Sequence, residues 1–459
     1  MHCGPRAARR ERLLPGNSMK LNSYLLKASI VGALGGLLFG FDTAVISGTL
    51  NSLRQVFELA PRAEGFTVAI ALWGTVVGAL SAGVVGQRLG GRNALRIMAV
   101  LYIVSSLGCA FAWSWSALLG FRFIGGLGIG GSSVLAPVYI AELAPASLRG
   151  RLVGMFQINV VLGILLAYFS NYCIARLGMG ALEWRWQLGV AAAPALLFLV
   201  MLFGIPQSPR WLATQHRIED ARNVLRLLRS SNDETELKEI VDSIHLEKSQ
   251  GSEPLFQRKF RYPIFVAITT GMFNQLAGIN AILYYLPSIF MAAGFSKLSG
   301  DLQAVAIGAM NLCATLLAMT LIDKLGRKTL LLIGSAGTAL CLGGVAEIFF
   351  TQRNQDWLVW ILVGYIFFFA PLGAVIWVYV GEIFPNTVRS KGQGLGSSSH
   401  WIMNAIISAL FPVVAKASGA YPFLFFAAMM VLQFFIVMFF YPETKGFTLE
   451  EMQHRLGID

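Results

Sequence analysis

One motif occurs twice in this chain, about half its length apart, and this duplication constrains the fold more than any other feature. Residues 138–145 read VYIAELAP and residues 378–385 read VYVGEIFP, and basic residues follow each copy. Solenoid repeats recur every 20–50 residues or so, whereas a repeat of half a chain is typical of a duplicated membrane protein. Two shorter pairs fit the same duplication: RLG at 88–90 with KLG at 324–326, and PQSPR at 206–210 with PETKG at 442–446.

The composition favours a location within a membrane. Hydrophobic residues make up 56% of the chain and charged residues 13%, against roughly 25% charge in soluble domains. A helix closes its own backbone hydrogen bonds and crosses a bilayer in about 20 apolar residues, and the alternation of a membrane β-barrel is absent from the sequence. We therefore predict an all-α membrane protein with twelve spans, at about 27–50, 66–86, 94–113, 116–141, 152–172, 186–206, 261–290, 300–322, 329–350, 357–384, 391–416 and 421–441.

The duplication divides these spans into two pseudo-symmetric bundles of six. In the polar stretch between them, apolar residues recur at helical spacing, so we expect short amphipathic helices there. Residues 1–18 are Arg-rich and Met19 follows, so they are either a basic tail or sequence upstream of the true start. The predicted division is an N-terminal tail at 1–21, a first bundle at 22–206, a linker at 207–260, a second bundle at 261–445 and a C-terminal tail at 446–459.

The formal net charge of +12 reflects how the chain is oriented in the membrane rather than the binding of an acidic ligand. In a soluble protein it would suggest a nucleic-acid partner. Here most Lys and Arg fall in the two tails and in every second loop, as the positive-inside rule requires. We therefore expect a multi-pass protein of the cytoplasmic (inner) membrane, with both termini in the cytoplasm and no nucleic-acid partner.

Several motifs that would indicate an enzyme or a cofactor are missing or misplaced. The P-loop pattern does not occur, so the sequence gives no support for ATP-driven chemistry. Gly126–Gly131 matches G-x-G-x-x-G but lies within a span with no preceding strand, so close helix packing explains it better than nucleotide binding. The five cysteines lack metal or disulfide spacing. We expect no enzyme activity, no cofactor and no metal.

Two charged residues lie inside predicted spans and away from the span ends, where a lone charge costs at least about 2.5–3.5 kcal/mol. They are Asp42 in the first span and Arg122 in the fourth. One interpretation is a structural ion pair. The other is proton coupling: Arg122 holds the carboxylate of Asp42 ionised, and loss of that contact in a desolvated site favours its protonation.

A second group of charges lies at the predicted cytoplasmic helix ends, in equivalent positions of both halves. Positive-inside flanks explain the Lys and Arg, but not two Glu at equivalent places of the repeat. We therefore predict that these latch residues hold the cytoplasmic faces of the two halves together. They are Arg88, Arg92, Glu142, Arg149, Arg151, Asp323, Arg327, Glu382 and Arg389.

Uncharged polar side chains within the spans form a third group. Amides can simply join helices, at under about 2 kcal/mol each, and that interpretation is open for Asn159 and Asn404. For amides clustered with aromatic residues, a polyhydroxylated ligand fits better, because amides both donate and accept and aromatic faces stack on sugar C–H surfaces. The predicted binding residues are Gln157, Asn274, Gln275, Asn280, Asn311, Trp377, His400 and Trp401.

At these motifs, from about residue 22 to 451, the chain resembles the sugar porter family of the major facilitator superfamily. It is most similar to bacterial sugar–proton symporters of the xylose transporter type. The resemblance implies two six-helix bundles around a central cavity, with access exchanged by rocking. It also implies that Asp42 stands where proton-coupled members have Asp and facilitators commonly have Asn, with Arg122 as its partner. By this resemblance the sugar-lining residues are Gln157, Gln275, Asn280, Asn311, Trp377 and Trp401.

The chain departs from the family pattern at four places. Asn274 replaces the first Gln of a Gln-Gln pair, and His400 stands where the xylose transporter has Gln. Gln87 and Gln207 replace acidic residues, which suggests a weaker latch in the first half. The resulting hypothesis is an importer of a monosaccharide, hexose or pentose, with a proton, functional as a monomer. A facilitative uniporter and a sugar sensor that does not transport remain the alternatives.

Overall fold

The computed structural model describes residues 22–145, 148–228, 233–249, 253–385, 388–446 and 449–456. Every regular element in these ranges is a helix. The first half contains α1 (Ser23–Val56), α2 (Pro61–Leu89), α3 (Gly91–Ala110), α4 (Trp115–Leu143), α5 (Arg149–Arg176), α6 (Glu183–Gly189) and α7 (Ala192–Met201). The linker contains α8 (Pro209–Thr214), α9 (Ile218–Leu228) and α10 (Asp233–Ser249). The second half contains α11 (Arg261–Leu276), α12 (Ile279–Ala292), α13 (Lys297–Leu325), α14 (Arg327–Thr351), α15 (Leu358–Glu382), α16 (Arg389–Ala417), α17 (Tyr421–Phe440) and α18 (Leu449–Leu456).

Within the described ranges, 12 helical stretches are long and apolar enough to cross a membrane, which confirms the predicted number. Two of them are composite. The sixth, Gly180–Gly204, contains α6 and α7 with a short 3-10 turn at each end, and the seventh, Arg258–Ala292, contains α11 and α12.

The first span is longer than its predicted range, 27–50. At its start the side chain of Asn22 accepts a hydrogen bond from the Tyr24 amide at 2.9 Å and so caps α1. At its end Arg54 makes a two-pronged contact with the buried Glu64 of α2, at 2.9 and 2.8 Å. Capping and the ion pair therefore continue α1 into polar sequence, beyond the apolar residues on which the prediction rested.

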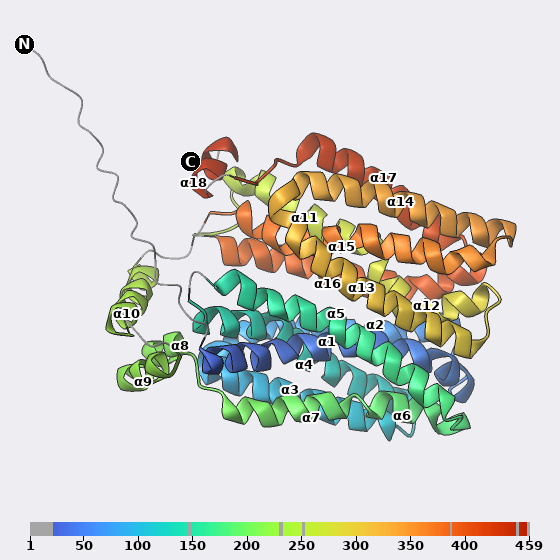
Figure 1. Ribbon diagram of the computed structural model, residues 1–459, viewed down its shortest axis with the longest axis horizontal. Helices are drawn as coiled ribbons and strands as arrows, with labels where there is room; N and C mark the ends of the chain where they lie inside the picture. Colours follow the sequence, from blue (N-terminus) through green and yellow to red (C-terminus); the bar gives the residue numbers. More distant parts are fainter. Residues whose placement is uncertain are drawn as a thin grey trace, which may run out of the picture.

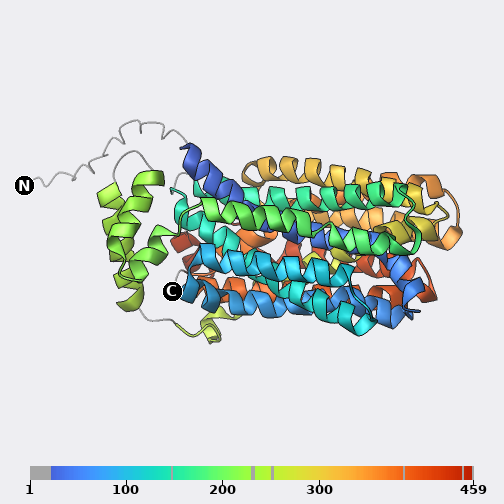
Figure 2. The same cartoon turned by 90° about the horizontal axis from the view of Figure 1, so that it is seen from below.

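The two halves form two layers, with the linker helices beyond one end (Figure 1). α1–α7 make one layer and α11–α17 the other, and they meet where α5 packs on α13, α2 on α16 and α1 on α12. We call the end that holds α8–α10, α18 and the start of α1 the tail end (Figure 2). The opposite end, with the last turns of α1, α5 and α12 and the first turn of α13, is the far end.

The duplicated motif produces the same contact twice. The Tyr139 hydroxyl of α4 donates to the Pro206 carbonyl at 2.6 Å. The Tyr379 hydroxyl of α15 donates to the Pro442 carbonyl at 2.7 Å. Each hydrogen bond connects the tail end of a motif helix to the loop segment that follows the last span of the same half. The repeat in the sequence is therefore a repeat in the structure.

The linker helices form a small unit against the first half. Their apolar residues at helical spacing, Leu212, Ala221, Leu225 and Leu237, pack together in one cluster. The Asn22 side-chain amide donates to the Leu227 carbonyl at 2.8 Å and thereby connects α9 to the start of α1. The linker helices thus pack against the first half, and the chain then leads from them to α11 in the second half.

Glycines bring α2 and α4 into backbone contact. A Cβ on Gly74 or Gly78 of α2 would lie 2.3 Å from a backbone oxygen of α4. A Cβ on Gly130 of α4 would lie 2.1 Å from the Thr75 carbonyl oxygen. Real Cβ atoms do not approach so closely, so Gly126–Gly131 is a packing surface and not a nucleotide-binding loop, as its place within a span predicted.

Gly130→Ala should destabilise the protein, because the new methyl group forces two tightly packed helices apart at a cost of about 1–3 kcal/mol. Gly120→Ala is the matched control on the same helix, since its Cβ would meet nothing within 4 Å. Thermal unfolding in detergent measures both. A melting temperature for Gly130→Ala equal to that of Gly120→Ala would contradict this account of the packing.

Candidate functional site

A break in the seventh span places polar side chains inside the membrane part of the molecule. Gly278 has φ +82°, and a Cβ there would also lie 2.3 Å from the Phe426 ring, so the position needs glycine for two reasons. The break ends α11 and starts α12. The Tyr365 hydroxyl of α15 donates to the Ala277 carbonyl at 2.9 Å, which gives this interrupted backbone a partner.

Amide groups on both sides of the break bond to one another and to a histidine. The Gln275 Nε2 donates to Asn274 Oδ1 at 3.2 Å and lies 3.1 Å from Nε2 and 3.3 Å from Nδ1 of His400 on α16. The Asn280 Nδ2 of α12 donates to Gln275 Oε1 at 3.2 Å. Asn274, Gln275 and His400 are buried and Asn280 is half-buried. The structure therefore brings four of the predicted binding residues into one network.

Trp401 connects this network to the first half. Its ring meets the Phe39 ring of α1 edge-on, with 5.3 Å between centroids, and the His400 ring edge-on at 5.1 Å. Trp401 is buried. The amide network thus lies next to the boundary along which the two halves meet.

Two of the predicted binding residues, Asn311 and Gln157, lie apart from the network's hydrogen bonds. Asn311 of α13 is buried and Gln157 of α5 is half-buried. Neither side chain has a hydrogen-bond partner among the described residues, so both amides are available to another group. The side chain of Trp377 lies outside the part of the chain that the structure describes.

Asn159 and Asn404 are satisfied within the protein. The Asn159 Nδ2 donates to the Met155 carbonyl of its own helix at 2.9 Å. The Asn404 Nδ2 donates to the Tyr284 hydroxyl at 3.4 Å, and Ser408 Oγ donates to Asn404 Oδ1 at 3.1 Å. These contacts favour the interpretation that both amides join helices rather than bind a ligand.

Asp42 and Arg122 lie near enough to interact electrostatically, but not in a direct ion pair. Arg122 is buried, and its Nε donates to the Thr67 carbonyl of α2 at 2.9 Å. Within the described ranges no contact of 4.0 Å or less joins its guanidinium to the half-buried Asp42. Arg122 is held in place by backbone, so its charge stays in the site when Asp42 changes.

Tyr102 of α3 lies near this pair, and no pattern in the sequence indicated it. Its side chain is 2% exposed, and its hydroxyl has no hydrogen-bond partner in the described part of the chain. It interacts electrostatically with both Asp42 and Arg122. An aromatic residue in an apolar helix looks like core, so only the fold reveals that this buried tyrosine lies near the charged pair.

The latch residues gather at the tail end, but each contact that the structure records lies within one half. In the second half the Arg327 Nη2 donates to Glu382 Oε1 at 2.9 Å, and Thr444 Oγ1 donates to Glu382 Oε2 at 2.6 Å. In the first half Glu142 bonds to the Ser208 side chain, at the position equivalent to Thr444.

The other latch residues have different surroundings. The Arg92 amide donates to Gln207 Oε1 at 3.0 Å. Arg149 donates to the Ala141 carbonyl at 3.1 Å and Arg389 to the Phe384 carbonyl at 3.4 Å. Arg88 and Arg151 are exposed, and the side chain of Asp323 lies outside the described residues.

The far end, in contrast, is joined between the halves. The Lys297 ammonium at the start of α13 lies 2.5 Å from Glu183 Oε1 on α6. The Asn51 Nδ2 of α1 lies 3.2 Å from the Met291 sulfur of α12. Sequence reasoning missed the pair Lys297–Glu183, because each residue alone looks like a solvated loop charge.

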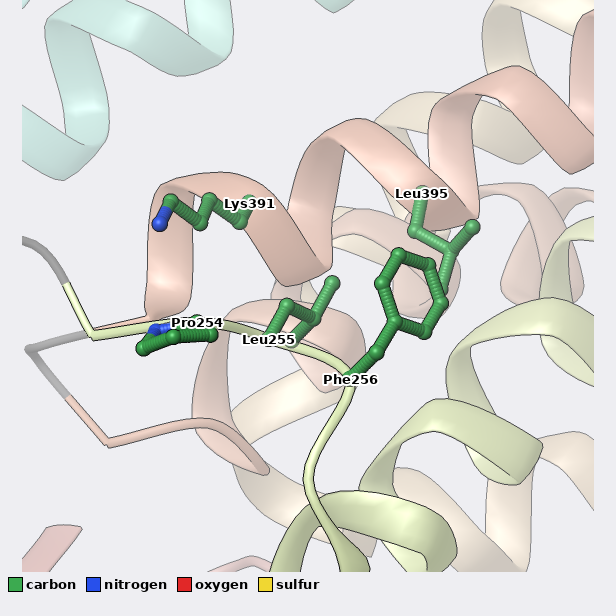
Figure 3. A pocket seen from close by; sticks show the side chains of 5 residues that line it. All are labelled: Pro254, Leu255, Phe256, Lys391 and Leu395. Carbon is green, nitrogen blue, oxygen red and sulfur yellow. The ribbon is translucent and has the colours of Figure 1, made fainter.

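A cavity of about 530 Å³ lies near the tail end, where the linker reaches the second half (Figure 3). It is lined by Pro254, Leu255 and Phe256 of the linker and by Lys391 and Leu395 of α16. The Lys391 Nζ donates to the Glu253 carbonyl at 2.7 Å, which fastens the linker to α16. None of the predicted binding residues lines this apolar cavity, so it is not the site described above.

Comparisons with known proteins agree with this architecture. Residues 28–456 match the family model described as sugar (and other) transporter. The D-xylose-proton symporter of Escherichia coli is 36% identical, over 95% of this chain and 96% of that protein. The arabinose-proton symporter of Bacillus subtilis is 35% identical, over 94% of each.

A solved structure is also similar over nearly its whole length. The inward open conformation of the xylose transporter XylE from E. coli superimposes with a TM-score of 0.84 at 34% identity, covering 94% of this chain and 100% of that one. Family, fold and duplicated motifs agree, and the matched proteins are transporters. The chain belongs to the sugar (and other) transporter family of the major facilitator superfamily.

Proposed function

We propose that this protein imports a monosaccharide, a pentose or a hexose, together with a proton, and that the amide network around Gln275 is its sugar site. The observation that carries the proposal is the buried network of Gln275, Asn274, Asn280 and His400 beside Trp401. Two relatives that transport a sugar with a proton, one for xylose and one for arabinose, support the substrate class and the coupling.

The chemistry of the network suits a ligand that must bind and then leave. Its amides and imidazole pair with one another, and a sugar hydroxyl can replace either partner because it both donates and accepts. Exchanging one neutral hydrogen bond for another changes the free energy little. Affinity then comes mainly from the apolar faces of Trp401 and of Trp377, which favours moderate binding and ready release.

Proton coupling is proposed for Asp42. Its carboxylate lies in α1, on the bundle that must move against α12 and α16, and the anchored Arg122 lies near it. Tyr102 offers a hydroxyl without a partner beside the pair. Protonation removes the charge from this part of α1 and so lowers the cost of closing the site to water.

The conformation fits the inward-facing state of an alternating-access cycle. The far end is joined across the halves by Lys297–Glu183, whereas the ion pair recorded between latch residues, Arg327–Glu382, lies within one half. With the tail end in the cytoplasm, as the basic flanks favour, these contacts support an inward-facing state. The latch residues would then join the halves in the opposite state.

Asp42→Asn should abolish accumulation of sugar against its gradient, because the amide keeps the size and hydrogen bonding of the side chain but carries no titratable proton. Proteoliposomes with an imposed pH gradient measure accumulation, and sugar exchange without a gradient is the control that should persist. If the variant still concentrates sugar when the gradient is applied, Asp42 is not the coupling residue. Should the parent protein itself fail to accumulate any sugar, uniport becomes the better assignment.

Gln275→Ala should weaken sugar binding by roughly tenfold or more, since a sugar hydroxyl left unpaired in a buried site costs about 1–3 kcal/mol. Asn159→Ala is the matched control, because this amide bonds to its own helix. Titration calorimetry with xylose, arabinose, glucose and galactose gives the affinities. Equal affinities in the two variants would place the sugar elsewhere.

His400→Gln should change which sugar binds best. An uncharged imidazole has one donor and one acceptor, whereas the longer Gln amide has two of each, so different hydroxyl arrangements are satisfied. We expect the affinity ratio between two sugars to change by roughly threefold or more, with the maximum transport rate within about twofold. An unchanged ranking across the same panel would assign His400 a structural role.

A further inference from the structure

A proline in α12 leaves one backbone carbonyl without its usual donor. Pro287 lies inside α12 and has no N–H, so the carbonyl of Leu283, four residues earlier, cannot make its intrahelical hydrogen bond. Leu283 is 2% exposed. A buried carbonyl without a donor destabilises a helix in an apolar surrounding, so this oxygen requires a partner from another element.

The partner comes from the other half of the molecule. The Tyr168 hydroxyl of α5 donates to the Leu283 carbonyl at 2.7 Å, and Tyr168 is 1% exposed. Its ring rests against Gly308 of α13, where an added Cβ would lie 3.1 Å from the ring. Figure 1 shows α5 running beside α13, one of the contacts by which the two halves meet.

The same arrangement occurs a second time, but within one half. Pro412 in α16 frees the carbonyl of Ser408, and the Tyr285 hydroxyl of α12 donates to it at 3.0 Å. Ser408 and Tyr285 are both buried. The two hydrogen bonds share their chemistry and differ in one respect, because only the bond from Tyr168 crosses between bundles that move relative to each other.

On this basis, and resting on the proposed alternating-access function, we propose that Tyr168 is a positioning residue that controls closure of the far end. Its hydroxyl holds the Leu283 carbonyl only while the far end is closed, as here, where Lys297–Glu183 also joins the halves. When the far end opens, water takes over the carbonyl. Because α12 carries Asn280, the same bond also sets where that amide lies in the sugar site.

Distance measurements between spin labels test this directly. The native cysteines are replaced by alanine, and labels are placed on cysteines introduced at Leu177 and Gln352, which lie exposed at the far ends of the two halves. A second pair at Gly150 and Ser390 reports on the tail end. Populations of long and short distances are then compared in the parent protein, Tyr168→Phe and Tyr285→Phe, without sugar.

Tyr168→Phe should raise the ratio of far-end-open to far-end-closed molecules by roughly threefold to tenfold, the value of one neutral hydrogen bond. At the tail-end pair of labels, the ratio of short-distance to long-distance molecules should rise by the same factor. Tyr285→Phe, which loses an equivalent bond within one half, should change the ratio by less than about twofold. A ratio for Tyr168→Phe equal to that of the parent or of Tyr285→Phe would overturn the proposal.

A third variant tests the role of the freed carbonyl. In Pro287→Ala the new N–H can bond to the Leu283 carbonyl within the helix, so adding Tyr168→Phe should have less than about twofold effect on the ratio. If Tyr168→Phe still changes the ratio by the full threefold to tenfold in the Pro287→Ala protein, the Leu283 carbonyl is not the group through which Tyr168 acts. Sugar uptake by the parent is measured separately. If uptake is absent while Tyr168→Phe still shifts the distances, the proposed function fails and the hydrogen-bond assignment stands.

Discussion

The apolar surroundings of a membrane span require every backbone polar group to find a partner inside the protein. Helices meet this requirement except where they are interrupted. In the second half α11 ends at Gly278, and Pro287, Pro371 and Pro412 each remove an amide donor inside a continuous helix. At Gly278, Pro287 and Pro412 a tyrosine hydroxyl from another helix supplies a donor. The interruptions that admit a polar site into the span are therefore also the points that tie neighbouring helices together. The polar site and the helix packing therefore depend on the same carbonyls, which lack a donor within their own helix.

The packing combines glycine contacts between helix backbones with side-chain contacts between the halves. Within the first half, glycines such as Gly74 and Gly130 bring helices into backbone contact, so α2 and α4 form one rigid piece. Several contacts between the halves use side chains: an ion pair at Lys297, a ring pair at Trp401 and the hydroxyl of Tyr168. Gly65 of α2 also brings the halves into backbone contact, because a Cβ there would lie 2.1 Å from the Ala409 carbonyl oxygen of α16. Side-chain contacts can break and reform at modest cost, whereas interlocked backbones cannot. The side-chain contacts between the halves support the proposed rocking of one bundle against the other.

Sequence patterns predicted the twelve spans and the role of Gly126–Gly131, because apolar length and glycine spacing are local properties. They also pointed to Gln275, Asn280 and His400, since polar residues within spans stand out. Tyr102 and Tyr168 were missed because a tyrosine in an apolar helix resembles ordinary core, and only the neighbouring helices decide what its hydroxyl meets. The separation of Asp42 from a direct contact with Arg122 depends on how α2 packs against α4, which no motif specifies.

The two halves cap equivalent helices with different chemistry. In the first half the neutral side chain of Gln207 accepts from the Arg92 amide at the start of α3. In the second half the carboxylate of Glu443 accepts from the amides of Arg327 and Lys328 at the start of α14, and the Arg327 side chain continues to Glu382. The Arg327–Glu382 pair is partly buried, with 12% and 29% of the two side chains exposed, so dissolved ions weaken it only in part, whereas the neutral Gln207 side chain carries no charge for them to screen. The equivalent contacts of the two halves thus differ in charge. The ionic strength of the solution therefore affects the contact in the second half more strongly than the contact in the first half.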